Sequence, residues 1–140
     1  MSIRSSLAEL LADPGSSGPA ILSTSPLIEV SYQALADQVD RLSGQLISAG
    51  LKPGNCVAIV LPNSLEFLVI FLALTRARLV ALPLNPAYKR EELRFFMEES
   101  EAQAVVTQGD NAVLRKTIAG IGLPVWPTRV DSRGGVELLE

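Results

Sequence analysis

Between Cys56 and Thr107 the chain alternates apolar runs of strand length with longer runs of helix length. The predicted elements are Val57–Leu61, Leu65–Ala77, Val80–Leu84, Arg90–Ser100 and Ala104–Thr107. This alternation is typical of an α/β fold, because parallel strands need a crossover helix between them. The strand runs lack polar alternation, so both faces of the sheet should be covered. We therefore expect a layered, mostly parallel sheet with helices on both faces.

Shorter elements are predicted before this region. Leu7–Ala12 suits a short helix, and Ala20–Ser23 and Ile28–Ser31 suit a hairpin, so residues 1–30 form a less regular leader. Ser31 suits the N-cap of a helix from Tyr32 to Ala49, and Gly50 suits its left-handed end.

After the alternating region, Asn111–Ala119 is predicted as a helix with Leu114 and Ile118 inward. Strands are expected at Val125-Trp126 and Val136–Leu139, with a turn around Arg133-Gly134-Gly135 between them.

The 3.6-residue periodicity also predicts which side chains are buried. In the helix from Tyr32 the inward set is Tyr32, Leu35, Ala36, Val39, Leu42 and Leu46, and the outward set is Asp37, Asp40, Arg41 and Gln45. In Arg90–Ser100 the inward set is Leu93, Phe96 and Met97. Asn63 is expected to cap the apolar helix, with Glu66 at its third position. Because that helix has no polar side through Leu74, it should lie between the sheet and a second layer.

Composition narrows the function classes. The 140 residues are 48% hydrophobic and 19% charged, which fits one globular domain. A net charge of -3 without clustered Lys and Arg argues against nucleic acid as a partner. The chain has no His and one Cys, which removes His-based nucleophile arrangements and most zinc or iron–sulfur sites. We therefore assign no catalytic, cofactor-binding or metal-ligating residue.

The chain is not expected to span a membrane or to be secreted. The start Met1-Ser2-Ile3-Arg4 lacks the pattern of a secretory signal, and the apolar run Leu65–Leu74 is about half of the roughly twenty residues that a span requires. The lone Cys56 fits a reducing compartment. An intracellular location, cytoplasmic or peroxisomal, follows as an expectation.

Motifs that could carry chemistry have simpler structural interpretations. Gly120-Ile121-Gly122 follows a predicted helix and not a strand, which is the wrong context for a phosphate loop. Glu91/Glu92 and Glu98/Glu99 suit a solvated helix face. Lys89-Arg90 suits a solvent-facing pair, Trp126 a packed side chain, and Tyr88 an exposed aromatic.

The order and spacing of several segments resemble the start of the AMP-forming acyl-CoA synthetases and adenylating ligases. These segments are Val30-Ser31-Tyr32-Gln33-Ala34-Leu35, Gly50-Leu51-Lys52-Pro53-Gly54-Asn55-Cys56-Val57-Ala58-Ile59, Leu61-Pro62-Asn63-Ser64 and Pro83-Leu84-Asn85-Pro86-Ala87-Tyr88. Arg76-Ala77-Arg78 looks like the oxalate–CoA ligase branch, since most members have Gly where this chain has Arg78. The family often has Ser or Thr where Lys89-Arg90 precede the next helix.

The resemblance implies the first part of a large N-terminal domain, so that residues 1–140 form an incomplete subdomain. It implies a parent ligase that uses ATP, Mg²⁺ and coenzyme A to adenylate a small carboxylic acid and convert it to a thioester. The family's phosphate loop, adenine site, acyl pocket and catalytic Lys lie beyond the matched region, so the chain alone is expected to be an inactive fragment.

Two alternatives remain open from the residues. The first is a non-catalytic interaction module that retains the ligase scaffold. It would self-associate through exposed apolar surface, since Leu65–Leu74 has no obvious second cover. The second is a complete flavodoxin-like or nucleotide-binding domain with a ligand at a strand-end crevice. The lack of a glycine-rich loop argues against the second alternative.

Overall fold

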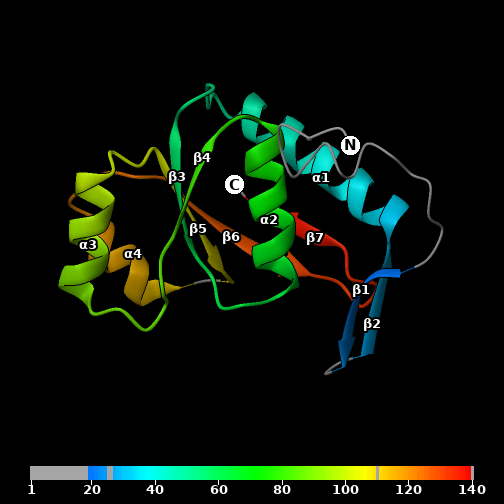
Figure 1. The fold of residues 1–140 in the computed structure, drawn as a ribbon. Coiled ribbons are helices and arrows are strands. Elements are labelled where there is room, and N and C mark those ends of the chain that lie inside the picture. The colour runs from blue at the N-terminus through cyan, green and yellow to red at the C-terminus, as the bar shows by residue number, and fades with distance from the viewer. Residues whose placement is uncertain (1–18, 25–26, 110, 140) are drawn as a thin grey trace, which may run out of the picture.

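The fold is a five-stranded sheet covered by helices, with a separate two-stranded hairpin (Figure 1). The computed structural model describes residues 19–24, 27–109 and 111–139, with side chains from residue 30 onward. The elements are β1 (Pro19–Thr24), β2 (Leu27–Ser31), α1 (Tyr32–Ser48), β3 (Cys56–Val60), α2 (Leu65–Arg76), β4 (Val80–Pro83), α3 (Arg90–Glu99), β5 (Ala104–Gln108), α4 (Ala112–Ile118), β6 (Val125–Val130) and β7 (Val136–Leu138). The predicted helix Leu7–Ala12 lies outside the described residues.

The strand order is β4-β3-β5-β6-β7, in which β4, β3, β5 and β6 are parallel and β7 is antiparallel. This confirms the predicted α/β class. The hairpin of β1 and β2 is also confirmed. Strand β6 is longer than the predicted Val125-Trp126, because pairing with β5 continues past Pro127 to Thr128.

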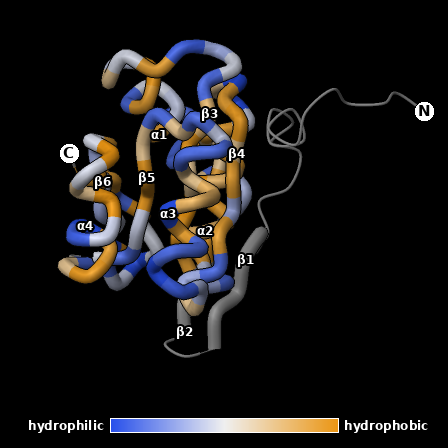
Figure 2. Tube along the Cα trace, turned by 90° about the vertical axis from the view of Figure 1, so that its left-hand side faces the viewer, coloured by the Kyte–Doolittle hydropathy of each residue, from blue (hydrophilic) through white to orange (hydrophobic). Residues whose placement is uncertain are grey.

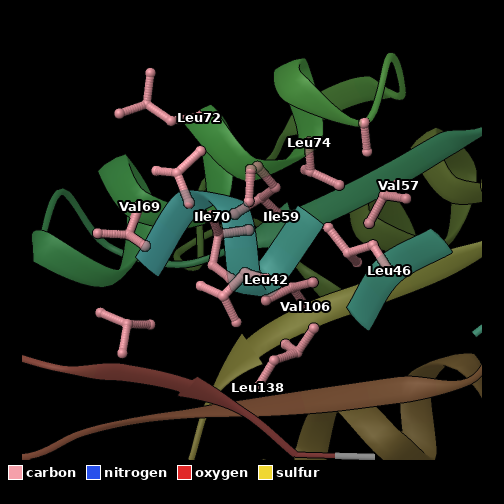
Figure 3. Packing of buried hydrophobic residues seen from close by; sticks show 14 of the residues in the cluster. Leu42, Leu46, Val57, Ile59, Val69, Ile70, Leu72, Leu74, Val106 and Leu138 are labelled. Carbon is pink, nitrogen blue, oxygen red and sulfur yellow. The ribbon is translucent and has the colours of Figure 1, made fainter. Parts of the chain in front are cut away.

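Side chains of β3 point alternately to two separate cores, one on each face of the sheet. Val57 and Ile59 pack against α1 and α2, whereas Ala58 and Val60 pack against α3 and α4. Figure 3 shows the first core, where Leu42 of α1 lies between Ile70 of α2 and the sheet. Because every second residue of an extended strand faces the same side, a run of apolar residues supplies both cores.

Helix α1 begins and ends as predicted. The Ser31 Oγ accepts the Ala34 N–H at 3.1 Å, and Gly50 follows the helix with φ of 99°. Leu35, Val39, Leu42 and Leu46 are buried, but Tyr32 is 40% exposed because the first turn extends past the core.

The polar side of α1 closes the outer edge of β7, which the periodicity did not predict. Gln38 Nε2 donates to the Gly134 carbonyl (3.1 Å), an Arg41 guanidinium N–H to Val136 (3.0 Å) and Gln45 Nε2 to Leu138 (2.7 Å). The Val136 N–H donates back to the Gln38 Oε1 at 2.8 Å. Arg41 and Gln45 are therefore not simply solvated, because they satisfy carbonyls that would otherwise form an open edge.

Helix α2 has a second cover within the chain, contrary to the expectation of an exposed apolar patch. α1 packs along it on the same face of the sheet, and Asp40 of α1 pairs with Arg76 of α2. Val69, Ile70, Ala73 and Leu74 are buried as a result, and Leu68 is left 39% exposed.

Two further predicted burial assignments, besides that of Tyr32, are wrong. Val80 in β4 is 51% exposed because β4 is the edge strand, with a neighbour on one side only. Phe96 in α3 is 36% exposed and lies beside Tyr88 and Phe95, whereas Leu93 and Met97 contact the core. Leu93 and Met97 are one turn apart and form the inward stripe, and Phe96 lies on the flank of that stripe, where it turns toward solvent.

Helix α2 ends in a Schellman motif with an unusual residue in the left-handed position. The Leu79 N–H bonds to the Leu74 carbonyl (2.9 Å) and the Arg78 N–H to Thr75 (3.1 Å), with a φ of 60° at Arg78. A side chain is disfavoured there, so the Gly common among family members suits the backbone better.

The turn between β6 and β7 is organised by one carboxylate. The Asp131 Oδ1 accepts the N–H groups of Gly135 and Arg133, each at 2.8 Å. These bonds stabilise the ionised form and lower the pKa of Asp131 from its ordinary value.

None of the helices in the described part of the chain is long and apolar enough to cross a lipid bilayer.

We predict that Arg78→Gly stabilises the protein. Relief of the left-handed strain, about 1–2 kcal/mol, should exceed the extra flexibility of glycine and leave a net gain of about 0.5–1 kcal/mol. Urea unfolding should show a higher midpoint at an unchanged slope. The matched control, Arg78→Ala, keeps the strained Cβ and should not gain; an equal gain in both variants would contradict the backbone explanation.

We also predict that the contribution of Asp131 depends on pH. Since its folded pKa is depressed, the stabilisation is present above the unfolded pKa of about 3.9 and is lost as pH falls through the lower folded value. Unfolding free energies of the protein and of Asp131→Asn should differ at pH 7 and converge as the pH falls below the folded pKa of Asp131. A difference that persists at low pH would show that the charge is not responsible.

Candidate functional site

The carboxyl ends of β3 and β4 border a cavity of about 520 Å³. In parallel α/β sheets this is the edge where ligands bind. Two loops form its walls, one from β3 to α2 and the other from β4 to α3. The lining residues are Leu61, Pro62, Asn63, Phe67, Pro83, Leu84, Asn85, Pro86 and Ala87. We refer to it as the β3–β4 crevice.

The first wall is held by Ser64 and not by the predicted cap Asn63. The Ser64 Oγ accepts the Phe67 N–H at 3.3 Å and donates to the Pro62 carbonyl at 2.9 Å. Asn63 is one residue too early to reach the first turn, so its exposed side chain lines the crevice.

The second wall is a turn built on Asn85. Its Oδ1 accepts the Ala87 N–H at 2.9 Å, and its carbonyl accepts the Tyr88 N–H at 3.0 Å. This local bonding follows from the short Asn side chain, which mimics a backbone turn. Pro86 fills the remaining position and has no N–H to offer a ligand.

The crevice can enclose an apolar group but has no acid–base machinery. Its size and its aromatic and proline lining resemble small-molecule pockets in general. No group of three or more His, Cys, Asp or Glu residues that could hold a metal ion occurs among the described residues. Pro62 and Pro86 in these loops have no N–H group to donate to a phosphate.

A smaller cavity of about 100 Å³ lies beside the crevice and shares Pro86 with it. Its polar residues already bond within the protein. The Arg90 guanidinium donates to the Lys116 carbonyl at 3.4 Å, and the Asn111 Oδ1 accepts the Leu114 N–H at 3.0 Å. Arg90 thus contacts the end of α4, where a cation is favourable, and is not simply a solvent-facing residue.

Behind the crevice, Glu66 makes a buried contact that sequence reasoning missed. The residue is 8% exposed, and its carboxylate accepts the Thr128 Oγ1–H at 3.0 Å and the Gln108 Nε2–H at 3.5 Å. The bonds join the first turn of α2 to the ends of β5 and β6. A lone acid within an otherwise apolar helix was the available signal, because such a residue needs a partner when buried.

The thiol of Cys56 is not activated. It is half-buried, and burial raises its pKa, although a hydrogen bond with Ser100 opposes the shift. A raised pKa leaves little thiolate near neutral pH, so the residue is a poor nucleophile.

The other candidate residues do not converge on a site. Glu91, Glu92, Glu98 and Glu99 are exposed on α3, and Trp126 is packed, as expected. Gly120-Ile121-Gly122 lies between α4 and β6, which leaves its context unsuited to phosphate. Tyr88 is 38% exposed and borders the smaller cavity. Arg76 and Arg78 lie at the end of α2, beside the amino ends of the parallel strands and therefore away from the crevice.

Comparison with known proteins identifies the scaffold. Residues 17–134 match the sequence profile described as AMP-binding enzyme. Over 87 residues the chain is 41% identical to the oxalate–CoA ligase of Arabidopsis thaliana, an alignment that covers 61% of this chain and 17% of that protein.

Solved structures share the fold. The apo MatB of Rhodopseudomonas palustris superposes with a TM-score of 0.75 at 33% identity, covering 91% of this chain and 26% of that one. The N-terminal domain of FACL13 from Mycobacterium tuberculosis gives a TM-score of 0.75 at 22% identity, covering 85% and 31%. The chain thus spans less than a third of each of these proteins.

We predict that Thr128→Val destabilises the fold by about 1–3 kcal/mol, because the buried Glu66 carboxylate loses its hydroxyl donor. Thr128→Ser keeps the donor and should cost less. The double variant Glu66→Leu/Thr128→Val should recover much of the loss, since both polar groups are then absent. Additive effects of the two substitutions in urea unfolding would contradict this coupling.

Proposed function

Because the chain belongs to the AMP-binding enzyme family, we propose that it is the N-terminal part of an ATP-dependent acid–CoA ligase. The match over residues 17–134 carries this proposal. Residues 1–140 then form an incomplete subdomain of the AMP-binding domain, and residues 1–30 a less regular leader with the β1–β2 hairpin. In the parent protein, ATP, Mg²⁺ and coenzyme A would serve adenylation of a carboxylic acid and then thioester formation.

The chain alone is inactive under this proposal. The described residues contain two proline-bearing loops at the carboxyl edge of the sheet where nucleotide sites place glycine-rich ones. Adenylyl transfer depends on positioned hydrogen-bond donors and metal, and the loops around the β3–β4 crevice supply neither. Under this proposal the segment is part of the scaffold, and the carboxyl edge of its sheet faces the rest of the ligase.

A small dicarboxylic acid is the proposed substrate class of the parent. The identity with an oxalate–CoA ligase supports it. Arg76 and Arg78 do not, because Arg76 pairs with Asp40 and Arg78 closes α2. The lone Cys56, which has no disulfide partner in this sequence, supports an intracellular location, cytoplasmic or peroxisomal.

A second candidate function is a non-catalytic module that self-associates. Phe95 of α3 and Val113 of α4, 57% and 74% exposed, favour it. Size-exclusion chromatography with light scattering separates the two: a monomer at every concentration argues against the module and leaves the ligase proposal intact.

We predict that the isolated chain releases no pyrophosphate from ATP in the presence of oxalate and coenzyme A. Pyrophosphate release is measured with a coupled assay, alongside a full-length oxalate–CoA ligase as the positive control. Turnover by the chain alone would overturn the inactivity. The coding sequence after Glu140 provides an independent check, since the proposal expects a Ser/Thr/Gly-rich loop and then a Lys downstream.

A further inference from the structure

We draw no further inference here: the strongest candidate, the exposed apolar patch that Tyr88, Phe95 and Phe96 form with Val113 on the outer surface of α3 and α4 (Figure 2), carries none because nothing in the structure shows what covers it.

Discussion

The architecture depends on the burial of parallel strands from both sides. Val57 and Ile59 face one core while Ala58 and Val60 face the other, so neither layer of helices is dispensable. The crossover connections place α2 on one face and α3 on the other. Helix α2 is apolar on nearly every side because it packs on both the sheet and α1, whereas α3 and α4 form an outer layer with a polar side.

A sheet that is buried on both faces still has two edge strands with unpaired backbone groups. In this protein, side chains limit how many of these groups stay unpaired. From α1, Gln38, Arg41 and Gln45 donate to the outward carbonyls of Gly134, just before β7, and of Val136 and Leu138 within it, as a neighbouring strand would. At the other edge Pro83 removes a donor. Glu66 has a related role at the carboxyl edge, since its carboxylate bonds to side chains of β5 and β6 from the start of α2. These polar contacts define where the sheet ends, while the apolar cores supply most of its stability.

The β3–β4 crevice lies where two parallel strands end. The loops at the carboxyl edge are shaped by Ser64 and Asn85, whose side chains bond to their own backbone, and by prolines that provide no donor. The result is a cavity that can enclose an apolar group. None of the residues that line it carries an ionisable side chain.

Much of the fold, and less of the site, could be predicted from the residues. Local signals were reliable where the physics is local: Ser31 caps α1, Gly50 follows it with a positive φ, and the apolar runs form β3 and β5 within a residue or two. The predictions were wrong where the packing of a whole element, and not the local pattern, determined the structure. Ser64 and not Asn63 caps α2 because α2 begins at Leu65 and Ser64 is the residue directly before it. Phe96 faces outward because α3 turns Leu93 and Met97 to the core.

The sequence by itself determined the α/β class and the position of nearly every described element, because hydrophobic periodicity and turn residues act over a few neighbours in the chain. The family followed separately, from the resemblance of several segments in their order and spacing. Only the tertiary structure decided that β4 is an edge strand, that Glu66 bonds to Thr128, that Arg41 and Gln45 close β7, and that the crevice lies beside Phe67 and Pro86. Each of these joins residues far apart in the chain, and their proximity depends on strand order and helix placement. No local pattern encodes that arrangement.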